Sequence, residues 1–334
     1  MTNTYEVPQE SRDLRDMVRQ LAQEKIAPRA GEIDREGKYP WDVRKLLAEH
    51  DILGLPFSER YGGTGTGTLV LQMAVEEIAK ACASSALILM IQELGTLPIQ
   101  LFGSDELKER FLPNCASGEW SPAFALSEPE AGSDPASMRT TAVRDGDEWV
   151  INGQKNWITN ASVADFYVVF AVTDRENKRM SAFVVEKERE GFDPGQLEHK
   201  LGIKGSPTGS PSFTDVRVPH ENLIGVEGKG MSVALGTLER TRLGAAAREL
   251  LYKACSMADL SERPADLGKW TSMAKLFASD NAMKVTVEAI QVLGGYGYVN
   301  EYPVERMLRD AKITQIYEGT NEIQRVVIAR SMGA

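Results

Sequence analysis

A carboxylate precedes a predicted helix near the end of the chain, in the run Tyr317-Glu318-Gly319-Thr320-Asn321. Asn321 and Gln324 have the spacing of a capping box, which predicts that the helix begins there and that free backbone N–H groups face a ligand oxygen beside Glu318. A carboxylate whose pKa is raised by burial can remove a weakly acidic proton. Glu318 is therefore a candidate general base. The alternative is an exposed glutamate of the kind common at helix starts.

Small residues gather in the run 124–134, a second region that could do chemistry. They are Ser127, Ala131, Gly132 and Ser133. Their size lets backbone N–H groups approach an anion, and Asp134-Pro135 is typical of a helix cap followed by proline at the first helical position. A phosphate or the edge of a flavin would fit this loop. The alternative is an ordinary turn that leads into a short helix.

An aromatic and a hydroxyl side chain lie two residues apart in the run 156–159, which predicts a short strand. In a strand, Trp157 and Thr159 share one face, so an indole and a hydroxyl would be presented side by side. Such a pair suits a flavin, because the ring can pack on it while the hydroxyl hydrogen-bonds to it. The alternative is that Trp157 is simply part of the core.

Three other patterns predict no cofactor or metal site. The Gly/Thr-rich run 61–68 contains a G-x-G-x-G string, but no buried strand precedes it, so we expect a flexible loop ending in a Thr68 helix cap. The cysteines and histidines are few and far apart, which predicts neither a disulfide framework nor a metal site. They are Cys82, Cys115, Cys255, His50, His199 and His220.

Helical and strand patterns divide the chain into three parts. Apolar residues recur at three- and four-residue steps over 10–30 and predict one helix that ends before Pro28. The same steps predict helices at 41–47, 69–82, 83–102 and 104–117. Short alternating runs between 140 and 221 predict strands, with hairpin signals at Asp145-Gly146-Asp147 and Asn152-Gly153. Helical periods return after 228–230, including one at 269–293 that ends at Gly294-Gly295 and one at 321–332.

These patterns predict an α+β fold. We expect an all-α domain over residues 1–120 and a β domain over 121–226, of antiparallel barrel or sandwich type and most simply a barrel. A shortened helical bundle is expected over 227–334. With 334 residues, the chain has the length of two or three domains.

Composition narrows the class of protein further. The 42% hydrophobic and 26% charged residues are typical of a soluble globular protein, and the net charge of −10 argues against nucleic acid as a partner. The chain starts without a signal or transit pattern. Its most apolar stretch, 83–103, is interrupted by polar residues and Pro98. We therefore expect a cytoplasmic protein with no membrane span.

Four runs taken together resemble the acyl-CoA dehydrogenase family of flavoproteins, in particular its short- and medium-chain members: 124–134, 153–160, 291–297 and 316–324. The resemblance covers nearly the whole chain, and the family has the same order of helical, β and helical domains. It implies FAD as the cofactor, an acyl-CoA substrate and electron-transferring flavoprotein as the electron acceptor.

The resemblance also implies roles for single residues, with Glu318 as the catalytic base. The implied cofactor contacts are Phe124, Leu126, Ser127, Gly132, Ser133, Trp157, Ile158, Thr159, Gln291, Gly294, Gly295, Thr320 and Glu322. The implied substrate contacts are Ser133, Glu239, Arg242 and Gly319, and no metal ligand is implied. Thr241 stands where other members carry their base, which favours Glu318. Alternatives remain: Glu239 and Arg240 as a solvated pair, Gly294-Gly295 as a helix cap, and Glu93 to Leu97 as acyl-pocket floor or plain packing.

The chain departs from the family at one place. Family members continue the helix of Thr241 and Arg242 for several turns, bend back through an Arg-x-x-Phe-Gly turn and return along a partner helix that contains a Gln. Here Ala247 is followed directly by Arg248 and a run that resembles the end of the returning helix. Roughly forty residues, or about 60 Å of helix, are absent. The junction has no Gly or Pro, which predicts a forced turn or one fused helix.

This departure bears on the cofactor and on the assembly. In the family, the missing turn reaches the flavin pyrophosphate of a neighbouring subunit, and the bundle builds the homotetramer or dimer. We therefore expect weakened flavin affinity and an altered assembly.

The resemblance predicts dehydrogenation of an acyl-CoA thioester to the trans-2-enoyl-CoA, with Glu318 removing the α-proton and flavin N5 taking the β-hydride. The alternative is a truncated, flavin-deficient paralogue that binds CoA without dehydrogenase activity. A flavin oxidase or monooxygenase is less favoured, because such relatives often lack a base like Glu318. Acyl chain length and branching stay open.

Overall fold

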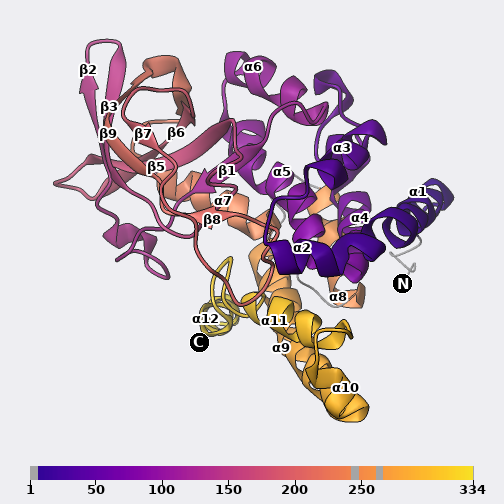
Figure 1. Ribbon diagram of the computed structural model, residues 1–334. Helices are drawn as coiled ribbons and strands as arrows, with labels where there is room; N and C mark the ends of the chain where they lie inside the picture. Colours follow the sequence, from indigo (N-terminus) through magenta and orange to yellow (C-terminus); the bar gives the residue numbers. More distant parts are fainter. Residues whose placement is uncertain (1–6, 242–247, 261–265, 334) are drawn as a thin grey trace.

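The computed structural model describes residues 7–241, 248–260 and 266–333 (Figure 1). Its first part is helical. The helices are α1 (Gln9–Leu21), α2 (Ala30–Glu36), α3 (Trp41–Glu49), α4 (Gly67–Ala81), α5 (Ala83–Phe102) and α6 (Asp105–Ala116). The first α-helix ends at Leu21, before Pro28 as expected, but the chain stays helical beyond it. A π-helical segment (Ala22–Ile26) and a 3₁₀ turn (Ala27–Arg29) continue α1 into α2, and Pro28 stands in the first turn of the 3₁₀ segment, which needs no N–H from it.

Helix α5 is the central helix of this part. By length and composition alone it could cross a membrane, but 78% of its apolar window is buried inside the protein. It packs against α4, α6 and strand β1 (Pro122–Ala125), and also against α7 (Gly230–Thr241). α5 therefore joins the three parts of the chain, which is why its apolar residues extend around most of its circumference.

An open mixed sheet forms the middle of the chain. Its strands are β1, β2 (Thr141–Asp145), β3 (Glu148–Gln154), β5 (Phe166–Asp174), β6 (Arg179–Glu186), β7 (Phe192–Asp193), β9 (Ser212–Pro219) and β10 (Leu223–Ile224). They run in the order β10-β6-β5-β2-β3-β9-β7, with β1 on β5. Strands β4 (Ile158–Thr159) and β8 (Thr208–Gly209) form a separate pair.

The expected antiparallel barrel is wrong in two respects. Both β1 and β2 pair with β5 in parallel. Among the described residues, the edge strands β10 and β7 do not pair with each other, so no closed barrel is found. The chain forms β3 and β4 before it returns as β5 beside β1 and β2, and local alternation of apolar residues cannot reveal such a pairing of non-consecutive strands.

Only one of the two predicted hairpin turns exists. Asp145 pairs with Glu148 across a two-residue turn in which Gly146 has a φ of +62°. Asn152-Gly153 instead lies inside β3, where the register against β9 is irregular between Ile151 and Gly153. A Cβ on Gly153 would come within 2.6 Å of the Thr140 Cα, so the glycine serves close packing and a bulge.

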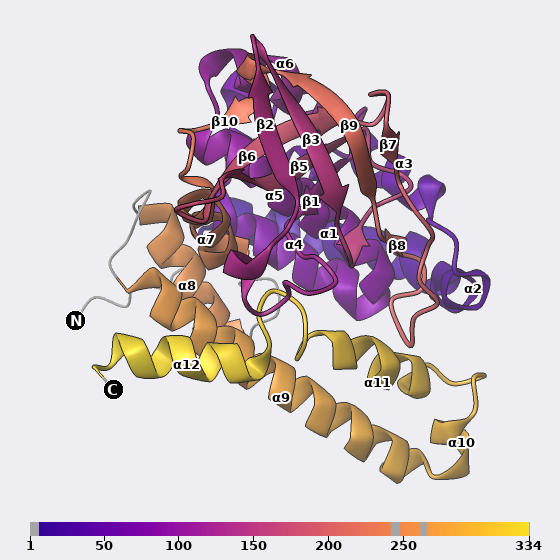
Figure 2. The same cartoon turned by 90° about the vertical axis from the view of Figure 1, so that its left-hand side faces the viewer.

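The last part is again helical. It consists of α7, α8 (Arg248–Leu260), α9 (Leu267–Leu293), α10 (Gly295–Tyr298), α11 (Val304–Ile313) and α12 (Asn321–Ser331). Figure 2 shows α9 and α10 extending away from the rest of the molecule, with α11 and α12 lying along α9. The predicted junction at Ala247, with its turn or fused helix, lies outside the described residues.

The expected Thr68 cap is replaced by a cap from another helix. Helix α4 begins at Gly67, two residues earlier than a Thr68 cap requires. The Asp259 carboxylate of α8 accepts hydrogen bonds from the backbone N–H groups of Thr68 (2.7 Å) and Leu69 (3.0 Å). A side chain 191 residues away thus satisfies the helix start and fixes α8 on α4.

Replacing Asp259 with Ala is expected to destabilise the protein by about 1 kcal/mol, because the two N–H groups at the start of α4 lose their acceptor. Asp259→Asn keeps one acceptor oxygen and should lose less. The measurement is the midpoint of thermal unfolding for both variants. Equal midpoints for wild type and Asp259→Ala would contradict the capping role.

Candidate active site

The Glu318 turn connects α11 to α12. Glu318 is half-buried and has a φ of +52°, and Gly319 follows with a φ of +87°. A left-handed conformation is uncommon for a glutamate and costs of order 1 kcal/mol or more, so it persists only when the surroundings impose it. The turn therefore fixes the direction of the Glu318 side chain.

The predicted capping box at Asn321 and Gln324 is wrong by one residue. Thr320 is the N-cap, and its Oγ1 accepts a hydrogen bond from the N–H of Ile323 (3.4 Å). Asn321 and Gln324 are buried and face inward instead. Gln324 Nε2 donates to the carbonyls of Glu318 (3.1 Å) and Gly319 (2.8 Å), so α12 holds the turn that precedes it. Glu322 lies exposed on the first turn of α12.

A second predicted segment follows strand β1 and is fixed by a buried ion pair. Lys155 Nζ lies 2.7 Å from Glu128 Oε1 and 3.3 Å from the carbonyl of Leu126, and both charged side chains are almost fully buried. Glu128 also accepts hydrogen bonds from the backbone N–H groups of Arg139 (2.6 Å) and Thr140 (3.1 Å). Burial would raise the pKa of Glu128, but the Lys155 charge and these N–H groups outweigh it and hold the pKa below its usual value.

The expectation that Trp157 and Thr159 share a face of one strand is wrong. Strand β4 contains only Ile158 and Thr159, and Trp157 precedes it with a φ of +61°. The Trp157 side chain is 60% exposed, so the core alternative is also wrong. Thr159 is half-buried and Ile158 is buried. The backbone reverses at Trp157 because Asn156 is fixed on both sides, by its N–H to the Ser127 carbonyl (2.9 Å) and by its side chain to Trp157 N.

This segment has room for a cofactor. A Cβ added to Gly132 would meet nothing within 4 Å, and Ser133 beside it is exposed. Asp134 caps the short helix at Pro135–Ser137, as predicted, by accepting from Ala136 N (3.2 Å). Phe124 and Ser127 are half-buried, and Leu126 is buried. An exposed indole, an open glycine loop and backbone N–H groups suit a flavin with its pyrophosphate.

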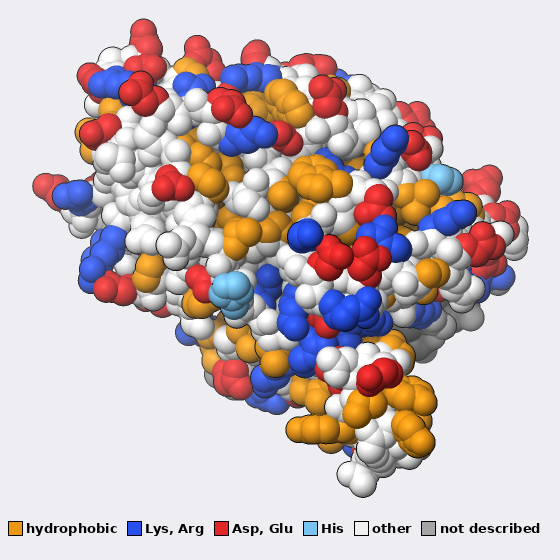
Figure 3. Space-filling model, in the orientation of Figure 1, with side chains coloured by type: hydrophobic (Ala, Val, Ile, Leu, Met, Phe, Trp, Pro, Cys, Tyr) orange, Lys and Arg blue, Asp and Glu red, His pale blue; other side chains and the backbone are white. Residues whose placement is uncertain are grey.

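The three remaining predicted cofactor residues lie elsewhere. Gln291 is exposed in the last turn of α9, Gly294 ends that helix with a φ of +58°, and Gly295 begins α10. They are about 24 Å along α9 from the residues that contact the Glu318 turn, at 1.5 Å per residue. Figure 3 shows hydrophobic side chains gathered on this projecting end, where Val292, Tyr296 and Tyr298 are mostly exposed. One chain alone does not bring these residues to the Glu318 turn.

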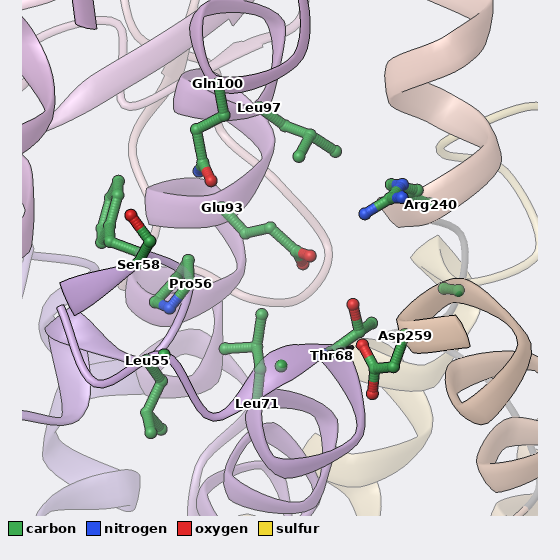
Figure 4. A pocket seen from close by; sticks show the side chains of 14 residues that line it. Leu55, Pro56, Ser58, Thr68, Leu71, Glu93, Leu97, Gln100, Arg240 and Asp259 are labelled. Atoms are coloured by element: carbon green, nitrogen blue, oxygen red, sulfur yellow. Dashed lines mark hydrogen bonds between the residues drawn. The ribbon is translucent and has the colours of Figure 1, made fainter. Parts of the chain in front are cut away.

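A cavity of about 530 Å³ lies between α4, α5, α7 and α8 (Figure 4). Glu93 and Leu97 reach it from α5, Arg240 from α7 and Asp259 from α8. The pKa of Glu93 is raised to about 8, chiefly by burial and also by the nearby Glu318 charge, while the Arg240 charge opposes the rise. Glu93, which belongs to the predicted pocket floor, therefore lies close enough to the candidate base Glu318 for their charges to interact.

The α7 residues predicted to bind substrate are only partly described. Glu239 is exposed at the last turn of the helix, as the solvated alternative expects. Arg242 lies outside the described residues. Thr241 is buried, and its hydroxyl has no hydrogen-bond partner among the described residues.

Glu93 is expected to make stability depend on pH. Its pKa of about 8 in the folded protein exceeds its ordinary value of 4.5, so the unfolded chain releases this proton first as the pH rises. Glu93 therefore costs stability progressively from about pH 4.5 to about pH 8. Glu93→Gln, which stays neutral, should raise the thermal midpoint more near pH 8 than near pH 6. An equal shift at both pH values would contradict the raised pKa.

Sequence reasoning missed several residues that hold the site. The Lys155–Glu128 pair, Gln324 and Asp259 were not predicted to have these roles. Lys155 and Glu128 lie within the motifs that were singled out, but Lys155 falls between β3 and β4, where no strand pattern indicates its burial. The partners themselves are far apart in sequence and become visible only in the fold.

Known proteins match nearly the whole chain. The family models for the N-terminal, middle and C-terminal domains of acyl-CoA dehydrogenase match residues 8–119, 123–216 and 244–333. An acyl-CoA dehydrogenase of Bacillus subtilis is 40% identical over 371 aligned positions, which cover 97% of this chain and 98% of the relative. Because the chain has 334 residues, the relative carries residues that have no counterpart here.

Solved structures agree with this match. The butyryl-CoA dehydrogenase of Megasphaera elsdenii superposes with a TM-score of 0.95 at 36% identity and covers 99% of this chain and 100% of its own. A chain in a structure of the electron-transferring flavoprotein of Acidaminococcus fermentans superposes with a TM-score of 0.95 at 35% identity. The match covers 98% of this chain and 99% of that one. An acyl-CoA dehydrogenase of Bacillus anthracis, complexed with FAD, superposes with a TM-score of 0.90 at 28% identity. The match covers 98% of this chain and 67% of that one.

The three domain models and the likeness over the full length lead to one conclusion. This chain belongs to the acyl-CoA dehydrogenase family, whose members are flavoprotein oxidoreductases that act on acyl-CoA.

Proposed function

We propose that the protein catalyses the FAD-dependent α,β-dehydrogenation of an acyl-CoA thioester to the trans-2-enoyl-CoA. The observation that carries this proposal is Glu318, a half-buried carboxylate in a fixed left-handed turn. It is close enough to the cavity residue Glu93 to raise the pKa of that side chain. A carboxylate held partly away from water is a stronger base toward the weakly acidic α-carbon of a thioester.

In the proposed reaction, Glu318 takes the α-proton onto a carboxylate oxygen. The electron pair of that C–H bond forms the double bond as the β-hydrogen leaves with its own pair. FAD, when bound, supplies the acceptor for this hydride. Backbone N–H groups beside Gly319, at the start of α12, would polarise the thioester carbonyl and stabilise the charge that develops on its oxygen. Ser133, Glu239 and Arg242 would contact the CoA portion.

The residues around β1 and β4 would hold the flavin. The exposed Trp157 ring would cover the isoalloxazine, and the Thr159 hydroxyl would hydrogen-bond to it. Gly132 and Ser133 would bind the pyrophosphate through their backbone N–H groups, where a larger side chain at position 132 is absent. The remaining proposed flavin contacts are Phe124, Leu126, Ser127, Ile158, Thr320 and Glu322.

The outer end of α9 would serve the cofactor of a neighbouring subunit. Gln291, Gly294 and Gly295 are exposed there and lie far from the Glu318 turn of their own chain. We further propose that the residues missing relative to the relatives fall at Ala247 and Arg248, within the C-terminal domain 227–334, after domains 1–120 and 121–226. Loss of that segment would weaken FAD binding and alter the homotetramer or dimer of the family.

Electron-transferring flavoprotein is the proposed electron acceptor, in the cytoplasm. Support comes from the superposition on a chain from the Acidaminococcus fermentans flavoprotein structure. The second candidate is a flavin-deficient paralogue that binds acyl-CoA without oxidising it. The shorter length of this chain favours it, since the alignment with the relative has more positions than the chain has residues.

Purification and anaerobic titration separate the two candidates. A dehydrogenase should retain FAD or take it up on addition, and its yellow colour should bleach when a saturated acyl-CoA is added without oxygen. The enoyl-CoA product is then identified by mass spectrometry. A protein that binds acyl-CoA but is colourless after incubation with excess FAD and removal of the unbound FAD would support the paralogue and refute the dehydrogenase.

A further inference from the structure

A fully buried lysine lies directly behind the Glu318 turn. Lys275, on α9, has no exposed surface, and its Nζ donates to the carbonyl of Gly319 (3.0 Å) and to Oδ1 of Asn321 (2.7 Å). The reaction proposed above gives it no part. A buried ammonium group is costly, and an apolar side chain of similar size often serves stability equally well. Its position therefore calls for an explanation other than packing.

The hydrogen bonds of Lys275 belong to a network that fixes the turn from two helices. Asn321, which accepts from Lys275, also donates to Ser279 Oγ (2.9 Å) and to Asp280 Oδ1 (2.7 Å), both on α9. From α12, Gln324 donates to the carbonyls of Glu318 and Gly319. The Gly319 carbonyl thus accepts from both helices.

The backbone conformation of Glu318 explains why the turn needs these hydrogen bonds. Its φ of +52° is unfavourable for a side chain with a Cβ, so an isolated turn would relax toward negative φ and move the carboxylate. The network holds the backbone carbonyls of Glu318 and Gly319, the two residues of this turn with positive φ. A shift of about 1 Å at a reacting group can lower a rate by roughly a hundredfold.

We propose that Lys275 is a positioning residue that keeps Glu318 in its left-handed conformation and its carboxylate aimed at the α-carbon of the substrate. The inference rests on the proposed function, because it takes Glu318 as the base. Lys275 touches neither substrate nor flavin in this account. It acts through its hydrogen bonds to the Gly319 carbonyl and to Asn321.

Lys275→Met removes the donor and keeps the length of the side chain. In FAD-loaded protein, we expect the rate of anaerobic flavin reduction by butyryl-CoA to fall about a hundredfold, while FAD content and the butyryl-CoA dissociation constant change less than about twofold. Lys275→Arg, which can still donate to both acceptors, should recover part of the rate. Lys284→Met is the matched control, because Lys284 is exposed on the same helix, and it should leave the rate unchanged.

A double-mutant cycle with Glu318→Gln separates positioning from a general structural effect. If Lys275 acts only through Glu318, Lys275→Met should cause no further loss in the Glu318→Gln background. A folded Lys275→Met protein with wild-type rate, or losses that multiply in the double variant, would overturn the inference. If Lys275→Met does not fold, Lys275→Gln, which keeps a donor, is used in the same cycle. Failure of both to fold would assign Lys275 to stability and equally overturn the inference.

The outcomes distinguish this inference from the proposed function. If Glu318→Gln reduces its flavin as fast as wild type, the base assignment itself is wrong. If Glu318→Gln is inactive while Lys275→Met is as fast as wild type, only the role of Lys275 is wrong.

Discussion

Replacing Glu318 with Gln is expected to slow anaerobic flavin reduction by acyl-CoA by about 10²- to 10⁴-fold. The amide keeps the size of the side chain but cannot accept the α-proton. Because the turn is held by Lys275 and Gln324 through backbone carbonyls, the substitution should leave its conformation intact. FAD content and acyl-CoA binding should therefore stay close to wild type, so that the loss falls on the chemical step.

Two further variants define what this result means. Glu227→Gln changes an exposed glutamate before α7 and should leave flavin reduction unchanged. Glu318→Asp keeps the carboxylate but withdraws it by one methylene, so its rate should lie between those of wild type and Glu318→Gln. Flavin reduction by Glu318→Gln at the wild-type rate would remove Glu318 from the mechanism.

Replacing Lys155 with Met is expected to produce the largest loss of stability, about 3–5 kcal/mol. It leaves the buried Glu128 carboxylate without the ammonium that lies 2.7 Å away. The same change frees the Leu126 carbonyl, at the end of the segment proposed to contact the flavin. We therefore expect a lower thermal midpoint together with a loss of bound FAD, measured on the same preparation by unfolding and by absorbance.

The partner variants test whether the pair or the single charge matters. Glu128→Gln should also destabilise, because Lys155 loses its counter-charge and one of the two carboxylate oxygens that accept from the N–H groups of Arg139 and Thr140 becomes an amide NH2. The double variant Lys155→Met/Glu128→Leu removes both charges and should be less unstable than Lys155→Met alone. If the loss of stability in the double variant equals the sum of the losses in the two single variants, the ion pair does not hold the segment.

The sequence was sufficient for the order of the elements and for the motifs that carry chemistry. Helix α5, the β2–β3 turn at Gly146 and the Asp134 cap follow from local patterns, and the structure has all three. These features depend on residues a few positions apart, whose side-chain period and backbone preferences are written in the chain. The family resemblance, which the comparisons confirm, rests on the same local runs.

The features that sequence reasoning misjudged depend on distant partners. The cap of α4 comes from Asp259, which no local pattern around Thr68 can show. Trp157 leaves the strand geometry because Asn156 is bonded to Ser127. The sheet is open and partly parallel because β5 pairs with both β1 and β2. Asn321 and Gln324 turn inward because Lys275 and the Glu318 turn bind them.

The decisive measurement for the proposed dehydrogenation is anaerobic mixing of the FAD-loaded protein with butyryl-CoA, unlabelled or carrying deuterium at the α-carbon. Wild-type protein should lose its flavin absorbance in a single turnover, and more slowly with the deuterated substrate, because Glu318 removes the α-proton as the flavin is reduced. The product should be the enoyl-CoA, lighter by two hydrogens. Unchanged flavin absorbance in protein shown to bind both FAD and butyryl-CoA would rule out the proposed reaction.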